Sequence, residues 1–141
     1  MMRYTAAMAV LAALVSQSAL AVPEPGFTLY SDVCYHREGG DVLGTRMGIL
    51  RLPEASYLYL QFAQGDFEAP QMIKLGPDDL KAGRLTFSAQ ILAKGPGSTF
   101  HGRITGMAVT GAFDNVPGLS RGGHLNLSRI VPDKKGFPDC K

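Results

Sequence analysis

The sequence predicts an all-β domain of about eight short antiparallel strands behind an N-terminal helical leader. Apolar residues alternate with polar ones at a period of two through most of the chain after residue 25. The 17 glycines and 9 prolines gather in clusters that bound these alternating segments. The connections between segments are too short to hold crossover helices, so successive strands are expected to pair antiparallel.

The first 21 residues have the pattern of a secretory signal peptide. Arg3 supplies a positive charge, an apolar run follows at 6–15, and 19–21 reads Ala-Leu-Ala. The run is shorter than the roughly 20 apolar residues that span a bilayer. We expect cleavage between Ala21 and Val22, with a periplasmic or secreted product and no stable membrane anchor. The alternative is a buried N-terminal helix.

The first four strands are expected in the N-terminal half of the domain. Alternation in FTLYSDVCYH places the first strand at 27–36. A second strand follows at 45–52 and ends before Pro53. In the third, SYLYLQFA at 56–63, the leucines and Phe62 face one way and the tyrosines the other. The fourth strand is short and lies at 69–75.

The segment 76–83 (GPDDLKAG) is expected to form one helical turn, because proline and acids suit a helix start and glycine its end. Further strands are expected at 85–91, at 100–104 and 107–113 around a turn at Gly106, and at 125–130. Glycines within three strands, at 48, 102 and 111, favour a strongly coiled sheet. Residues 22–141 are therefore expected to form a single up-and-down β-barrel, with a two-sheet β-sandwich as the alternative.

The two cysteines lie near the ends of the mature domain, at Cys34 and Cys140. In an exported chain they are expected to form one disulfide. Closing a loop of roughly 100 residues stabilises a fold by about 4–5 kcal/mol in the chain-entropy model. The bond would hold the tail at 132–141 against the first strand. Two free thiols in redox chemistry are the alternative, although the Cys-x-x-Cys spacing is absent.

Charge and motifs exclude several classes of function. The chain has 14 basic and 12 acidic residues, scattered rather than striped, so no nucleic-acid partner is expected. There is no Gly-x-Ser-x-Gly, His-Glu-x-x-His or P-loop motif. No catalytic residue, metal ligand or cofactor is therefore assigned. His36 shares a predicted strand face with Asp32 and Cys34, and is the one histidine whose neighbours are of interest; His101 and His124 are expected to face solvent.

Aromatic side chains provide the candidate binding surface. Tyr57 and Tyr59 lie opposite the apolar row of their strand, and Tyr30, Tyr35, His36 and Arg51 are grouped with them. Aromatic residues on that face indicate either a strand covered on both sides or a surface left open for a partner.

The C-terminal part has a pattern seen in small exported β-proteins. It reads FHGRITGMAVTGAF at 100–113, followed by LNLSR at 125–129. This fifth of the chain is similar to lipocalin-like and calycin-like domains. The resemblance implies a barrel and a small apolar ligand.

The features together favour a non-enzymatic binding module that holds a small amphiphilic ligand. An inhibitor or immunity-type module that binds an envelope protein is the alternative, with the loop at 114–123 as a contact. A hydrolase using His36 and nearby carboxylates is a third hypothesis.

Overall fold

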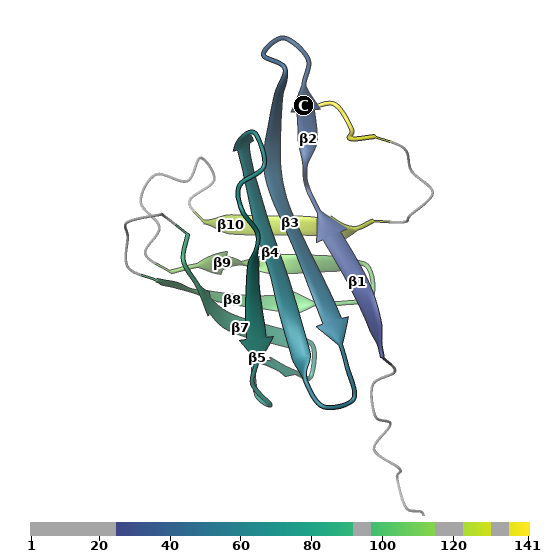
Figure 1. Ribbon diagram of the computed structural model, residues 1–141, viewed down its shortest axis with the longest axis vertical. Helices are drawn as coiled ribbons and strands as arrows, with labels where there is room; N and C mark the ends of the chain where they lie inside the picture. The colour runs from purple at the N-terminus through teal and green to yellow at the C-terminus, as the bar shows by residue number, and fades with distance from the viewer. Residues whose placement is uncertain (1–24, 92–96, 115–122, 131–135) are drawn as a thin grey trace, which may run out of the picture.

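The computed structural model describes residues 25–91, 97–114, 123–130 and 136–141 (Figure 1). The expected leader at 1–21, with its cleavage point between Ala21 and Val22, lies outside these ranges, as does most of the loop at 114–123. No helix in the described ranges has the length and hydropathy of a membrane span. The strands of the described ranges are β1 (Gly26–Ser31), β2 (Cys34–His36), β3 (Asp41–Arg51), β4 (Ser56–Gly65), β5 (Gln71–Leu75), β6 (Leu80–Lys81), β7 (Arg84–Ala89), β8 (Ser98–Ile104), β9 (Ala108–Phe113) and β10 (His124–Arg129).

One antiparallel sheet contains all of these strands, in agreement with the predicted all-β class. Its order is β5-β4-β3-β1-β10-β9-β8-β7-β6, and β2 pairs with β3 outside this path. Strand β1 pairs with both β3 and β10 and therefore joins the two halves. Figure 1 shows the half made of β1, β3, β4 and β5 lying across the half made of β7 to β10. The core fills the space between the halves.

The predicted closed barrel is wrong, because no strand ladder joins β5 to β7. The chain turns sharply after Leu75: Gly76 N–H donates to Asp79 Oδ2 at 2.6 Å, and Asp79 N–H donates to the Gly76 carbonyl at 3.3 Å. Strand β6 follows at once and pairs with the start of β7. The edge of β7 that would complete a barrel is thus partly taken by β6.

The predicted helical turn at 76–83 is wrong. Residues 77–79 form a turn, and 80–81 are strand β6 rather than the end of a helix. Ala82 and Gly83 both have positive φ, at 51° and 75°, as a tight hairpin between β6 and β7 requires. This short hairpin is one of two reasons why the described ranges contain ten strands instead of about eight.

The second reason is a break in the predicted first strand. Val33 N–H donates to Ser31 Oγ at 2.9 Å, and Thr45 N–H donates to Asp32 Oδ1 at 2.6 Å. Gly44 lies opposite with a φ of 126°, and a Cβ there would lie 2.8 Å from Asp32 Oδ1. The segment 27–36 therefore forms two strands, β1 and β2, separated by a local distortion that only glycine on the partner strand accommodates.

Four phenylalanines form the centre of the core. The Phe100 ring stacks on Phe87 with centroids 5.1 Å apart and meets Phe113 edge-on at 5.1 Å; Phe113 also contacts Phe62 at 6.3 Å. Phe100 is fully buried. The apolar row predicted for β4 is buried, which confirms the alternation there. The same period of two buries Leu85, Phe87 and Ala89 in β7, Phe100 and Ile104 in β8, and Leu125 and Leu127 in β10. The buried hydrophobic cluster is Tyr30, Met47, Ile49, Leu58, Leu60, Phe62, Leu75, Leu85, Phe87, Ala89, Ile91, Phe100, Ile104, Val109, Phe113, Leu125 and Leu127.

The predicted disulfide between Cys34 and Cys140 is present, with Cα atoms 4.9 Å apart. It holds the tail beside β2, the second part of the predicted first strand. Tyr35 N–H donates to the Pro138 carbonyl at 2.8 Å, and Cys140 N–H donates to the Tyr35 carbonyl at 3.0 Å. The oxidised pair is compatible with an oxidising location such as the one the leader predicts.

The tail also covers an arginine on the outer face of β3. The guanidinium carbon of Arg46 lies 4.3 Å from the centroid of the Phe67 ring and 4.8 Å from that of Phe137. Arg46 Nε is buried without a hydrogen-bond partner. The disulfide positions Phe137 for this contact, so the tail and the β3 face are stabilised together.

Candidate functional site

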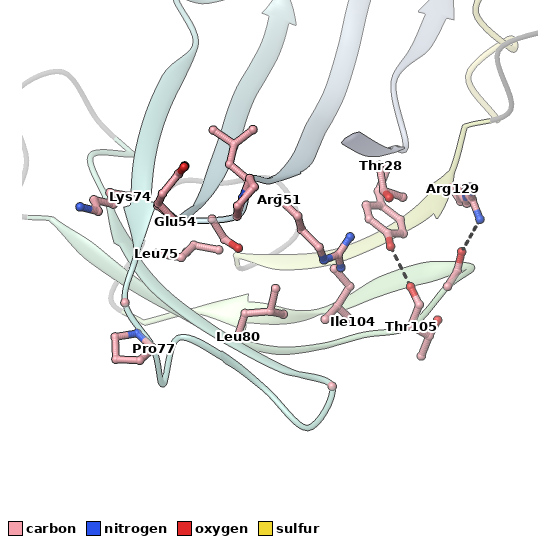
Figure 2. Close-up of a pocket in the computed structure, with 18 residues that line it drawn as sticks. Thr28, Arg51, Glu54, Lys74, Leu75, Pro77, Leu80, Ile104, Thr105 and Arg129 are labelled. Atoms are coloured by element: carbon pink, nitrogen blue, oxygen red, sulfur yellow. Dashed lines mark hydrogen bonds between the residues drawn. The ribbon is translucent and has the colours of Figure 1, made fainter. Parts of the chain in front are cut away.

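A cleft of about 850 Å³ opens at one end of the sheet (Figure 2). The β3–β4 loop, the turn after β5, the β6 hairpin and the β8–β9 turn surround it. Its volume lies within the roughly 300–1,000 Å³ range of small-ligand sites. At this end of the sheet, the inward-facing side chains of β1, β3 and β10 extend beyond the buried core. Side chains at these positions therefore determine the chemistry of the cleft.

Two arginines occupy the last inward positions of their strands. In β3 the row Met47 and Ile49 continues to Arg51, and in β10 the row Leu125 and Leu127 continues to Arg129. Both arginines line the cleft. Figure 2 shows the Arg51 side chain extending from the end of β3 into the space between Leu75 and Ile104. The alternation along β3 and β10 therefore places an arginine, rather than an apolar side chain, at the position where each strand borders the cleft.

Apolar side chains form the wall of the cleft next to the core. Leu75 and Ile104 are 6% and 8% exposed, and Leu80 packs against the same cluster. Leu75 and Leu80, from β5 and β6, lie on the far side of the cleft from Thr28 in Figure 2, whereas Ile104, from β8, lies below Arg51. A ligand here would meet the apolar side chains of Leu75 and Leu80 on one side and guanidinium groups on the other.

Tyr30 separates the cleft from the core. Its side chain is 2% exposed, and its hydroxyl donates to the Thr105 carbonyl at 2.8 Å. Burial raises the pKa of Tyr30, while the positive charges of Arg51 and Arg129 act in the opposite direction. Both guanidinium groups therefore lie within electrostatic reach of the phenol. Tyr30 is part of the cleft lining and not of an exposed aromatic surface.

Tyr57 and Tyr59 lie on the outer face of β4, away from the cleft. Both are half-buried, and Tyr59 Oη donates to Gln61 Oε1 at 2.5 Å. Their proposed companions are separated from them: Tyr30 faces inward, and His36 is in β2 beside the tail. The residues that the sequence analysis grouped as a binding surface therefore do not form one surface.

The outer face of β1, β3, β4 and β5 is nevertheless rich in exposed apolar groups. Phe27 is 56% exposed and Met72 is 58% exposed. The Phe27 ring lies over Gly48, where a Cβ would come within 2.5 Å of it. Register places Tyr59 opposite both Gly48 and Met72. We refer to Phe27, Leu29, Leu50, Tyr57, Tyr59 and Met72 as the outer apolar face.

The expected alignment of Asp32, Cys34 and His36 on one strand face is wrong, because β1 ends at Ser31 and Asp32 lies in the break. Asp32 caps a backbone N–H of β3, and Cys34 is oxidised. His36 is exposed and accepts a hydrogen bond from Gly39 N–H at 3.2 Å through Nδ1. None of the three lines the cleft.

The other histidines lie on the outer face of the second half of the sheet, exposed as expected. His101 and His124 are both register partners of Ala112, from β8 and β10 respectively. His101 Nε2 is 3.1 Å from Asp114 Oδ2. Among the described residues no group of three or more potential metal ligands comes together.

The sequence named Arg51 but missed Arg129, Leu75, Leu80 and Ile104 as parts of a site. One signal was available: an arginine continues the inward apolar row of its strand. Set against protein-family models, curated proteins and solved structures, the chain shows no match.

Proposed function

We propose that the chain is an exported, non-enzymatic binding module that holds a small amphiphilic ligand in the cleft at the open end of the sheet. The observation that carries this proposal is the two-sided lining of the cleft. Leu75, Leu80 and Ile104 offer apolar contact, while Arg51 and Arg129 offer charge within the same space. Such a lining suits a molecule with one apolar and one polar end.

The filled core limits how far a ligand enters. Ile49, Leu58 and Leu85 are fully buried directly behind the cleft wall. A ligand therefore lies in the mouth of the fold rather than along its axis, and its apolar part is short. This differs from the ligand-filled lumen that the barrel prediction implied.

A fluorescent probe tests the proposal. N-phenylnaphthylamine is neutral and apolar, and its emission rises when it leaves water. We expect saturable binding to the mature protein, and loss of binding in Ser56→Phe, where a ring is placed among the cleft residues. Ser128→Phe, an exposed change on β10, is the matched control. Equal binding by both variants would exclude the cleft as the site.

A second candidate function, an envelope protein-interaction module of the inhibitor or immunity type, is favoured by the outer apolar face. Exposed Phe27 and Met72 on one sheet face are typical of a contact surface. Its test is capture of one specific envelope protein by the wild type and loss of that capture in Met72→Asp. Retention by Met72→Asp would argue against this face.

A further inference from the structure

The chain as a whole has nearly equal numbers of basic and acidic residues, but the cleft does not. Two cationic side chains, Arg51 and Arg129, line it together with a single acid, Glu54. Lys74 also borders the cleft, but it is the register partner of Tyr57 on the outer face, and its side chain points away from the cleft in Figure 2. No salt bridge joins Glu54 to any of them within the described ranges. The cleft therefore carries a net positive charge.

The hydrogen-bonding capacity of these cations is largely unused. Arg129 Nη1 donates to the Gly106 carbonyl at 3.4 Å, a long contact. In the described part of the chain the Arg51 guanidinium has neither a hydrogen bond nor an ion pair, although the residue is only partly exposed. A half-buried guanidinium with five free donors is a strong site for an oxyanion, because charge-assisted bonds gain strength away from bulk water.

The geometry separates the two kinds of contact. Arg51 enters the cleft from the end of β3, and Arg129 is the register partner of Tyr30 on β10. The apolar wall of Leu75 and Leu80 comes from the opposite side, from β5 and β6. A head group on the arginines would leave its tail free to lie on this wall.

We infer that the ligand of the cleft is a short-chain amphiphile with an anionic head group, a carboxylate or a phosphate, which Arg51 binds and Arg129 flanks. This inference rests on the proposed function and adds the chemical class of the ligand. The head group binds through guanidinium hydrogen bonds, and the tail contacts Leu75, Leu80 and Ile104.

Four octyl compounds with different head groups provide the test: octanoate, octyl phosphate, octyl glucoside and octyltrimethylammonium. Each is titrated against the protein bearing N-phenylnaphthylamine, and displacement of the probe is measured. We expect octanoate and octyl phosphate to bind at least about tenfold more tightly than the neutral and cationic compounds. Their relative affinities identify the preferred oxyanion. Higher ionic strength is expected to weaken both.

Variants test the anionic head group separately from the proposed binding of an amphiphile in the cleft. Arg51→Gln is expected to remove the preference for anionic heads, measured relative to that variant's own affinity for the probe. Arg103→Gln, an exposed change on the outer face of β8, is expected to leave both the preference and probe binding unchanged. Equal binding of all four head groups, or an unaltered preference in Arg51→Gln, would overturn the anionic assignment alone. Failure of the probe to bind in the cleft would overturn both proposals.

Discussion

The side chain of Gln71 joins β5 to the chain just after β7 by pairing with the backbone of Gln90. Gln71 Nε2 donates to the Gln90 carbonyl at 2.5 Å, and Gln90 N–H donates to Gln71 Oε1 at 3.0 Å. The amide group thus imitates a strand residue at the point where the strand ladder is missing. The two halves of the sheet are held together here without a closed barrel.

Replacing Gln71 by glutamate removes the donor and directs a carboxylate at the Gln90 carbonyl. We expect the free energy of unfolding to fall by about 1–3 kcal/mol, because a hydrogen bond is lost and like dipoles face each other. The Gln90 amide is expected to exchange its hydrogen faster, because a carboxylate repelled by the Gln90 carbonyl withdraws and takes with it the oxygen that accepts from Gln90 N–H. Gln64→Glu, an exposed change on β4, controls for the added charge. Unchanged exchange at Gln90 would show that Gln71 does not hold the two halves together.

Gly102 leaves space for the Phe100 ring. A Cβ at Gly102 would lie 2.5 Å from Phe100 Cε1 and 2.5 Å from the Thr110 carbonyl oxygen. We expect Gly102→Ala to lower the free energy of unfolding by about 1–3 kcal/mol, as overpacked cores do. Gly106→Ala, where a Cβ meets nothing within 4 Å, is the control. Urea unfolding measures both, and equal midpoints would mean that the ring does not need this space.

The disulfide is expected to carry a large share of the stability of the domain. Replacing Cys34 and Cys140 together by serine should lower the free energy of unfolding by about 2–5 kcal/mol, because the unfolded chain regains the freedom of a long loop. Reductant should destabilise the wild type and leave the double variant unchanged. A wild type that is insensitive to full reduction would contradict this role.

The buried phenol of Tyr30 is expected to lower the free energy of unfolding at alkaline pH. Burial raises its pKa above the usual value of about 10, so the folded state holds the phenol proton more tightly than the unfolded chain. The associated stabilisation is complete below about pH 10 and is lost as the pH rises through the folded-state pKa. Urea unfolding at increasing pH should show this decline in the wild type and a smaller one in Tyr30→Phe. Equal slopes would refute the assignment.

Local patterning predicted the elements whose structure depends on one buried face. Leu58 and Leu60 in β4, and Leu125 and Leu127 in β10, alternate cleanly with polar or tyrosine side chains, and all four are buried. The cysteine pair was predictable because a chain with two cysteines has one possible internal pairing. These features follow from short-range sequence and general chemistry.

The predictions that failed concern features that depend on contacts between residues far apart in the sequence. The break at Asp32 depends on Gly44 of the neighbouring strand, and the open seam depends on Gln71 reaching Gln90. The alternation at 27–36 put Phe27 and Leu29 on its apolar side, but in β1 this side is the outer face: Phe27 is exposed, whereas Tyr30 on the other side is buried. The cleft also escaped prediction, since its residues come from strands far apart in the sequence.

Amide chemical-shift mapping with octanoate compares the cleft directly with the outer apolar face. If the cleft binds the ligand, the largest shifts will occur at residues that line it, such as Arg51, Leu75 and Thr105, and Ser56→Phe will abolish them. Shifts centred on Tyr59 and Met72, or the absence of any saturable shift, would contradict binding in the cleft.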